Sequence, residues 1–152
     1  MTADDSVVII GAGQAGVQTA EALRTLGFAG AVTLLGDENH APYHRPPLSK
    51  AWLAGEMDAA QLTMRTPEVL ARKGITLRTG VSVAFIDRAA KELRLNDGSS
   101  LAYTGLVLAT GSTPRALTLP GASAKGVLAL RSRVDAEAIA AQVAQSVDKQ
   151  RG

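Results

Sequence analysis

Two runs of consecutive apolar residues stand near the start of the chain, at residues 6–10 (SVVII) and 31–35 (AVTLL). Such runs are typical of strands that a parallel sheet buries on both faces. Between them, Gly16, Ala20 and Leu23 recur at helical spacing. The pattern therefore predicts a β–α–β unit of about thirty residues.

Shorter elements are predicted for the rest of the chain. Thr66-Pro67-Glu68 is typical of the N-cap and first turn of a helix that Gly74 would end. A second short helix would begin at Pro47 or Leu48 and end near Gly55, and apolar residues from Ala136 to Val147 mark one face of a closing helix. Strands are predicted at 75–78, 81–87, 92–95, 101–103, 106–109 and 127–130.

The three strands between residues 81 and 103 form a small antiparallel meander, in which Asn96-Asp97-Gly98 supplies a turn. They occupy the place where a crossover helix would normally stand. We therefore expect an α/β fold of the Rossmann-like type: a parallel sheet with helices and an antiparallel β-meander as crossover. With 152 residues, the chain suits one domain, which we place at residues 1–148, followed by a polar tail at 149–152.

The composition of the chain excludes several classes of function. Sixteen Lys and Arg against 14 Asp and Glu give a net charge of +2, and no basic stripe marks a nucleic-acid partner. The chain has no cysteine, which excludes disulfides, thiolate metal sites and iron–sulfur ligation by these residues. The start of the chain is acidic, and its first apolar run is too short for a signal sequence or a membrane span. We expect a soluble, cytoplasmic protein without a membrane or nucleic-acid partner.

A glycine loop follows the first predicted strand directly: Gly11-Ala12-Gly13-Gln14-Ala15-Gly16. In the dinucleotide-binding fingerprint, the first glycine permits a tight turn, the second lets the backbone approach a pyrophosphate, and the third lets helix and strand pack closely. The helix N-terminus then offers N–H groups to the phosphates. The alternative is a glycine-rich turn with a purely structural role, and the flanking strand and helix argue against it.

Asp37 stands about 20 residues after the loop, at the end of the second predicted strand, as the fingerprint requires. Asp37, or Glu38 beside it, would accept hydrogen bonds from an adenosine ribose. An acid there also disfavours a 2′-phosphate. This context alone does not separate NAD from FAD.

Other candidate residues lack the partners that a metal site or a nucleophile would require. His40 and His44 have no second ligand at metal spacing, so we predict no metal site. Ser49 and Ser112 lack a nucleophile elbow. Tyr43 could cover a flavin or merely fill its loop.

Three segments in order resemble one family: the glycine loop, His44-Arg45-Pro46-Pro47-Leu48-Ser49-Lys50, and Leu106 to Arg115 with its Ala109-Thr110-Gly111 motif. The chain resembles the N-terminal FAD half of the ferredoxin reductases of the putidaredoxin-reductase-like and rubredoxin-reductase-like group, to which apoptosis-inducing factor is related. The resemblance covers Val7 to about Asp148. It implies a Rossmann-like FAD-binding fold, with FAD as the cofactor.

The resemblance also implies which residues contact FAD. Arg45 and Arg131 suit phosphate and polar flavin contacts, and Val83 would lie near the adenine. Lys50 would place a positive charge beside the flavin and act in catalysis. The candidate cofactor-binding residues are Gly11, Gly13, Gln14, Ala15, Gly16, Asp37, Glu38, Arg45, Lys50, Val83, Ala109, Thr110, Gly111 and Arg131.

Similar disulfide reductases carry redox cysteines in the stretch that Pro42 to Lys50 occupies here. Without a thiol, electrons must leave elsewhere, and a small iron–sulfur protein, a ferredoxin or rubredoxin, is the implied partner. A complete reductase of this family also has a second Rossmann domain for NADH. The sequence holds one glycine fingerprint, so we expect a fragment that does not oxidise NADH alone.

Three hypotheses follow. The first is the FAD-binding part of an NADH:ferredoxin or rubredoxin reductase. The second is a non-catalytic adenine-nucleotide-binding or interaction module related to apoptosis-inducing factor. The third, an NAD-binding dehydrogenase domain, is disfavoured because the meander and the segment from Arg45 to Lys50 have no place in it.

Overall fold

The computed structural model describes residues 4–151, with side chains described up to residue 146. The chain divides into two compact units. The first unit holds the described residues up to Tyr43 together with Thr63–Gly111. The second unit holds His44–Leu62 and the described residues from Ser112 onward.

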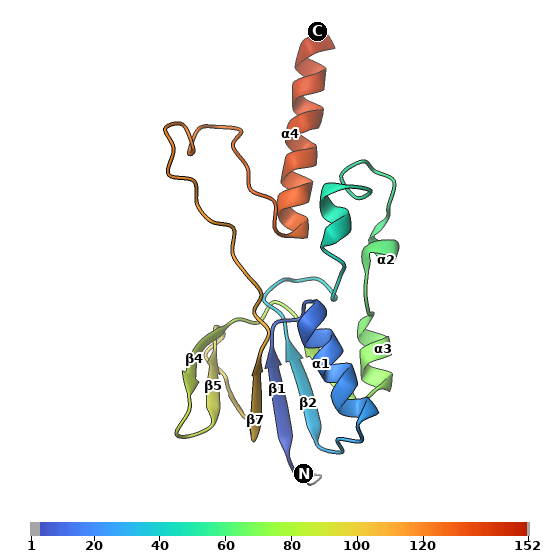
Figure 1. The fold of residues 1–152 in the computed structure, drawn as a ribbon, viewed down its shortest axis with the longest axis vertical. Helices are drawn as coiled ribbons and strands as arrows, with labels where there is room; N and C mark the ends of the chain where they lie inside the picture. The colour runs from blue at the N-terminus through green and yellow to red at the C-terminus, as the bar shows by residue number, and fades with distance from the viewer. Residues whose placement is uncertain (1–3, 152) are drawn as a thin grey trace. The chain divides into compact units, whose positions relative to one another are not determined.

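The first unit contains two sheets and two helices (Figure 1). Its elements are β1 (Ser6–Ile10), α1 (Gln14–Thr25), β2 (Ala31–Leu35), α3 (Pro67–Arg72), β3 (Ile75–Arg78), β4 (Val83–Asp87), β5 (Glu92–Leu95), β6 (Ser100–Ala102) and β7 (Gly105–Leu108). A parallel sheet has the order β3-β2-β1-β7, and an antiparallel sheet has the order β4-β5-β6. The predicted α/β fold with its meander is confirmed.

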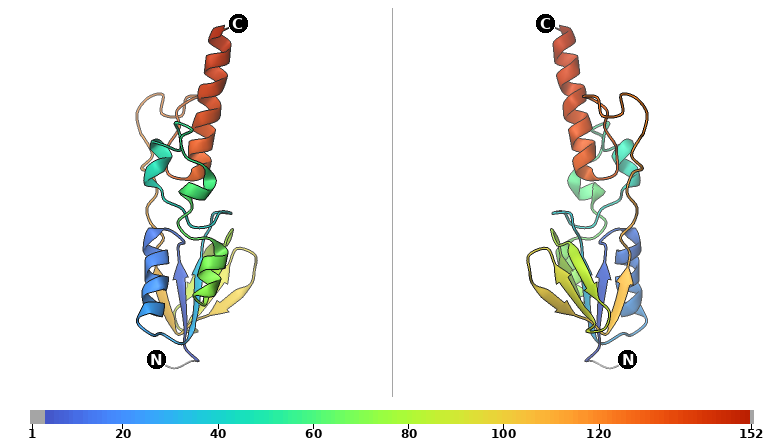
Figure 2. Two further views of the ribbon diagram at one scale, coloured as in Figure 1. Left: turned by 90° about the vertical axis from the view of Figure 1, so that its right-hand side faces the viewer. Right: turned by 90° about the vertical axis from the view of Figure 1, so that its left-hand side faces the viewer.

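The parallel sheet lies between the helices on one side and the meander on the other (Figure 2). Ile9 faces a core cluster with Val17 of α1 and Leu70 of α3, whereas its neighbour Val8 packs against Leu93 of β5. All five side chains are at most 1% exposed. Successive residues of a strand point to opposite faces, so a strand covered on both faces needs the unbroken apolar run that the sequence shows.

Several predicted boundaries are confirmed. Strands β1, β2, β3 and β5 have the predicted bounds. Helix α3 begins after Thr66, whose hydroxyl accepts a hydrogen bond from the Val69 N–H at 3.4 Å. The meander strand predicted from residue 81 begins instead at Val83. The N–H groups of Val81 and Ser82 bind the Gly36 carbonyl and the Asn96 side chain, and so do not join the ladder.

The second unit contains a 3₁₀ helix, η1 (Pro46–Ser49), and the helices α2 (Ala59–Leu62) and α4 (Arg133–Arg151). The helix predicted to reach Gly55 therefore stops early. The Lys50 N–H donates to the Pro47 carbonyl in the tighter 3₁₀ pattern, and Lys50 leaves helical geometry at φ −129° and ψ −113°. Helix α4 includes residues 149–151, which belong to the predicted polar tail.

Residues 127–130 form no strand, so that prediction was wrong. They belong to the second unit, whose described residues contain no strand to pair with them. The Val127 N–H donates instead to the nearby Ala124 carbonyl at 3.1 Å, and Val127 and Leu128 are about half exposed at 48% and 47%.

Among the side chains of helix α4 that the structure describes, up to residue 146, burial is confined to the first turns. Ala136 is fully buried, whereas Val143, on the predicted apolar face, is 57% exposed. Within the part of the chain that the structure describes, no helix combines the length and apolar character that crossing a membrane requires.

Candidate functional site

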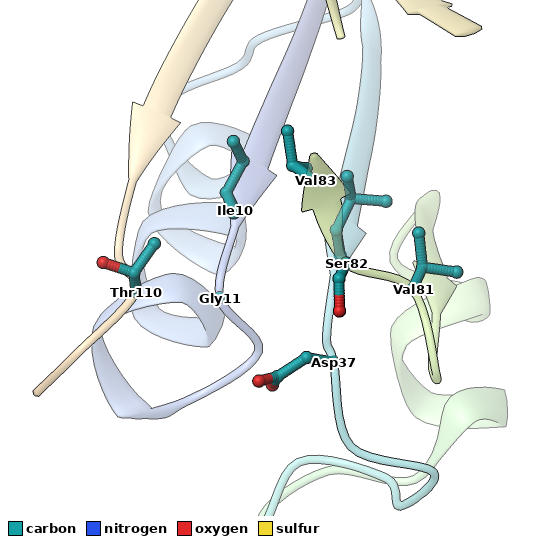
Figure 3. Close-up of a pocket in the computed structure, with 8 residues that line it drawn as sticks. Ile10, Gly11, Asp37, Val81, Ser82, Val83 and Thr110 are labelled. Carbon is teal, nitrogen blue, oxygen red and sulfur yellow. The ribbon is translucent and has the colours of Figure 1, made fainter. Parts of the chain in front are cut away.

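A pocket of about 200 Å³ opens at the carboxyl ends of β1, β2 and β7, within the first unit (Figure 3). Its lining residues are Ile10, Gly11, Leu35, Asp37, Val81, Ser82, Val83 and Thr110. The sheet order reverses here, because β2 follows β1 on one side while β7 pairs with β1 on the other. Ligands of open α/β sheets bind at such a switch point, outside the carboxyl ends of the strands.

Gly11 makes the turn that leaves β1. Its φ of +112° lies in a region that residues with side chains rarely adopt. The Gly11 N–H donates to the Leu35 carbonyl at 2.8 Å, and a Cβ at Gly11 would collide with the carbonyl of Ala109. The turn therefore requires glycine both for its conformation and for its packing against the end of β7.

The other two glycines of the loop have different surroundings. A Cβ at Gly16 would collide with the carbonyl oxygen of Gly11, so Gly16 allows α1 to pack against the loop. Gly13 is the N-cap of α1, and a Cβ there would meet no atom within 4 Å. Gly13 thus leaves open the space in front of the helix N-terminus, where the N–H groups of Gln14 and Ala15 have no partner within the helix.

Asp37 projects from the loop after β2 toward the glycine turn (Figure 3). Backbone hydrogen bonds hold this loop on both sides of Asp37. The Val81 N–H donates to the Gly36 carbonyl at 2.9 Å, and the Gly80 N–H donates to the Glu38 carbonyl at 3.0 Å. Asp37 is therefore fixed against the segment that forms the opposite wall of the pocket.

Glu38 has a different environment. Its carboxylate oxygen Oε2 accepts a hydrogen bond of 2.6 Å from the hydroxyl of Tyr43, and Glu38 does not line the pocket. The two acids that sequence reasoning left as alternatives are thus separated by the structure: Asp37 lines the pocket and Glu38 binds Tyr43. Tyr43, whose role was open, is 8% exposed and also lies outside the pocket lining.

The wall opposite the glycine loop is formed by Val81, Ser82 and Val83. Asn96, in the turn between β5 and β6, holds this wall: its side-chain oxygen Oδ1 accepts from the Ser82 N–H at 3.0 Å, and its N–H donates to the Ser82 carbonyl at 2.9 Å. Sequence reasoning named Val83 but missed Val81, Ser82, Ile10 and Leu35. The only signal for them in the sequence was that each stands one or two positions from a predicted site residue.

The segment after β7 closes the remaining side. The Ala109 N–H donates to the Ile10 carbonyl at 2.8 Å, and Ala109 packs against the main core cluster. Thr110 lines the pocket, and Gly111 turns the chain away with a φ of +74°. The structure therefore brings Gly11, Asp37, Val83 and Thr110 together around one pocket.

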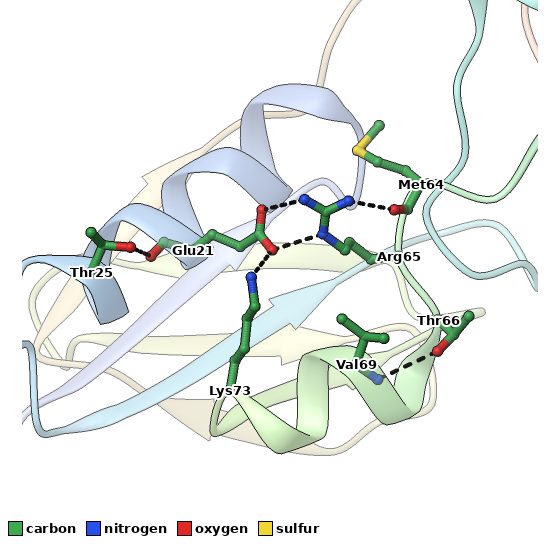
Figure 4. Close-up of polar contacts among 7 residues, drawn as sticks. All are labelled: Glu21, Thr25, Met64, Arg65, Thr66, Val69 and Lys73. Carbon is green, nitrogen blue, oxygen red and sulfur yellow. Dashed lines mark hydrogen bonds and ion pairs between the residues drawn. The ribbon is translucent and has the colours of Figure 1, made fainter.

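A separate polar cluster joins α1 to the segment around α3 (Figure 4). Glu21 binds the guanidinium of Arg65, with Oε1 to Nε at 2.8 Å and Oε2 to Nη2 at 3.3 Å, and it also pairs with Lys73. The Arg65 hydrogen bond, assisted by Lys73, lowers the pKa of Glu21. None of these residues lines the pocket, so we assign the cluster to stability.

The other predicted site residues lie in the second unit. Arg45 donates from Nη1 to the Arg131 carbonyl at 2.9 Å, and both arginines line a cavity of about 350 Å³. Lys50 is exposed at the end of η1 and does not line that cavity. Trp52 packs against Arg133, whose guanidinium carbon lies 5.0 Å from the ring centre.

The start of α4 orders the backbone at Arg131. Asp135 accepts hydrogen bonds from the N–H groups of Ser132 at 2.7 Å and Arg131 at 2.9 Å, while the Ser132 hydroxyl accepts from the Asp135 N–H at 3.3 Å. This reciprocal pair is a capping box. Its hydrogen bonds, those from Ser132 first, lower the pKa of Asp135.

Comparison with known proteins gives a family match over nearly the whole chain. The family described as pyridine nucleotide-disulphide oxidoreductase matches residues 5–149. A probable ferredoxin reductase from Castellaniella defragrans is 48% identical over 143 residues, which cover 94% of this chain. The putidaredoxin reductase of Pseudomonas putida is 44% identical over 146 residues, again 94% of this chain.

Solved structures agree with these relatives. The reductase in a covalent putidaredoxin reductase–putidaredoxin complex matches with a TM-score of 0.83 and 45% identity over 93% of this chain. A ferredoxin reductase from Rhodopseudomonas palustris matches with a TM-score of 0.86 and 39% identity over 93% of the chain. In each of these four comparisons the chain spans only 35% of the other protein's length.

Proposed function

The chain belongs to the pyridine nucleotide-disulphide oxidoreductase family, and on this premise we propose that it is the FAD-binding part of an NADH-dependent ferredoxin or rubredoxin reductase. The pocket at the switch point of the sheet carries the proposal. It joins a glycine turn, an open helix N-terminus and a single lining carboxylate, that of Asp37, among the described residues. These are the groups that a dinucleotide requires.

The described residues fit the adenosine and pyrophosphate end of FAD. The open space at Gly13 lets a phosphate approach the first N–H groups of α1, because a Cβ there would stand in that space. The Asp37 carboxylate suits the ribose hydroxyls, and the apolar side chains of Val81 and Val83 suit the flat face of an adenine. Ala109, Thr110 and Gly111 would close the site from the end of β7.

For the flavin end we propose Arg45, Lys50 and Arg131. Arg45 and Arg131 line one cavity in the second unit, and their guanidinium groups suit phosphate or flavin oxygens. The role of Lys50, a fixed positive charge that favours reduced flavin, rests on its place in the segment from His44 to Lys50. Bound FAD would supply the two-electron to one-electron conversion that links NADH to an iron–sulfur protein.

The partners are part of the same proposal. Relatives are reductases of putidaredoxin and of rubredoxin, and the chain contains no cysteine that could receive electrons as a dithiol. We therefore propose a small iron–sulfur protein as acceptor and NADH as donor. Because this chain spans 35% of its relatives, the NADH site would belong to a further part of the protein.

The proposal is tested by titrating the purified 152-residue chain with FAD, ADP and NADH. Calorimetry measures the affinity for each ligand, and the absorbance of the flavin reports the environment of its ring. We expect FAD and ADP to bind more tightly than NADH, and the flavin bands to shift. Circular dichroism and thermal unfolding check that the chain is folded.

Each other outcome has a definite meaning. Binding of ADP without a shift of the flavin bands would restrict the site on this chain to the adenosine end. Preference for NADH over FAD would favour an NAD-binding domain and contradict the proposal. A folded chain that binds none of the three ligands would overturn it.

A separate experiment addresses Lys50. In the longer reductase, Lys50→Met is expected to slow flavin reduction by NADH, measured by stopped-flow absorbance, at unchanged FAD content. Unaltered reduction kinetics would remove Lys50 from the mechanism while leaving the FAD site intact.

A further inference from the structure

We propose, as an extension that rests on the proposed function, that Tyr43 is a positioning residue of the nucleotide site: its hydroxyl holds Glu38 outside the pocket and thereby keeps Asp37 as the acid that meets the ribose. Tyr43 itself does not line the pocket. It would act through Glu38 and the backbone of the loop that carries Asp37.

The position of Tyr43 is strongly constrained. Its side chain is 8% exposed, and its backbone forms an isolated antiparallel bridge with Thr63. Next to this bridge the Met64 N–H donates to the Pro42 carbonyl at 2.8 Å. A tyrosine hydroxyl anchored in this way offers a fixed donor to a carboxylate.

The contact between Tyr43 and Glu38 is short and charge-assisted. The hydroxyl donates to Oε2 of Glu38 at 2.6 Å, a length typical of an O–H donor with an ionised acceptor. Such a bond is stronger than one between neutral groups. It gives Glu38 a partner on the side of the loop that does not line the pocket.

The backbone carries this restraint to the pocket. The Glu38 carbonyl accepts from the Gly80 N–H, and the Gly36 carbonyl accepts from the Val81 N–H. Asp37 stands between Gly36 and Glu38, and Val81 belongs to the pocket wall. A restraint on Glu38 is therefore expected to restrain Asp37 on one side of the pocket and Val81 on the other.

The electrostatic consequence concerns adjacent carboxylates. A second carboxylate beside Asp37 would repel the phosphates of a nucleotide, because like charges a few ångströms apart repel strongly near a protein surface. Binding Glu38 to Tyr43 leaves one acid, Asp37, for the ribose. The Tyr43 hydroxyl is thus expected to set both the affinity for the nucleotide and the order of the loop.

The first test uses Tyr43→Phe, which removes the hydroxyl and keeps the buried ring. We expect the Kd for ADP, measured by calorimetry, to rise about three- to tenfold. This is less than the loss of a direct hydrogen bond to a charged ligand would give, because Tyr43 acts on the nucleotide only through Glu38 and its loop. Tyr103→Phe is the matched control, because Tyr103 is the other tyrosine of the chain and does not line the pocket.

A double-mutant cycle with Glu38→Ala separates positioning from simple packing. If Tyr43 acts through Glu38, Tyr43→Phe has no further effect on the Kd in the Glu38→Ala background. Additive effects of the two substitutions would contradict the proposal. Thermal unfolding of each variant reports whether the fold is intact.

The second test needs no ligand. Hydrogen exchange at the Gly80 and Val81 amides is expected to be several-fold faster in Tyr43→Phe than in the wild type, while exchange in β1 stays unchanged. Unchanged exchange at Gly80 and Val81 would overturn the proposal even if ADP binds normally. A wild-type chain that binds no ADP would instead overturn the proposed function, and exchange would still decide the role of Tyr43.

Discussion

Gly13→Ala is expected to separate nucleotide binding from stability. The φ of Gly13 is −84°, which alanine adopts without strain, and the added Cβ would meet no protein atom within 4 Å. The folded chain therefore accommodates the methyl group. A phosphate approaching the N–H groups of α1 would not, because the methyl group occupies the space in front of them.

The stability change should be small because two effects oppose each other. Replacing glycine by alanine at a compatible position stabilises by about 0.4–1 kcal/mol through the unfolded chain. Alanine is a poorer N-cap than glycine, by about 0.5–1 kcal/mol. The net change stays within about 1 kcal/mol, so Tm should move by no more than about 4 °C in a chain of this length.

The binding change should be large. Loss of one charge-assisted hydrogen bond to a phosphate costs about 1.5–3 kcal/mol, which corresponds to a Kd for ADP raised about 10- to 100-fold. Calorimetric titration and a thermal melt on the same preparation measure both quantities.

Gly16→Ala provides the contrast. Its Cβ would collide with the carbonyl oxygen of Gly11 and lie 3.1 Å from Cδ1 of Leu34, and overpacking of this kind costs about 1–3 kcal/mol. Its Tm should fall by about 2–12 °C. A Gly13→Ala chain that binds ADP as the wild type does, or one that unfolds like Gly16→Ala, would refute the reasoning.

Three further predictions follow from the polar contacts. Asp37→Ser should weaken ADP binding about tenfold and lower the ratio of affinities for ADP over 2′,5′-ADP, because the carboxylate that repels a 2′-phosphate is gone; an unchanged ratio in calorimetry would contradict this. Glu21→Gln should lower stability by about 0.5–1 kcal/mol at pH 7. Arg65 holds the pKa of Glu21 below its ordinary 4.5. The stability difference between the wild type and Glu21→Gln should therefore be fully present above pH 4.5 and vanish as the pH falls through the lower pKa of the folded state. A difference in Tm that does not depend on pH would argue against the ion pair. Ser132→Ala should destabilise the fold by about 0.5–2 kcal/mol and raise the pKa of Asp135 toward its ordinary 3.8. An NMR titration of the Asp135 carboxyl measures this pKa, and an unchanged value would contradict the role of the capping box.

The local part of the fold was predictable because its signals are local. The unbroken apolar runs at residues 6–10 and 31–35, the glycine loop between them and the acid that follows specify a β–α–β unit with a pocket at the carboxyl ends of its strands. The Thr66-Pro67-Glu68 cap likewise depends on neighbouring residues only. In these segments the backbone conformation, the side-chain periodicity and the turn residues all favour the same structure.

Only the tertiary structure decided which partner each group takes. Asp37 and Glu38 are chemically alike and adjacent, yet Asp37 lines the pocket whereas Glu38 accepts a hydrogen bond from the hydroxyl of Tyr43. The apolar run at 127–130 resembles a strand, yet it pairs with none, since a strand requires a neighbour from elsewhere in the chain. The side of a loop that a side chain faces, and the segment with which a strand pairs, are chosen by the fold as a whole, so residue patterns along the chain cannot specify them.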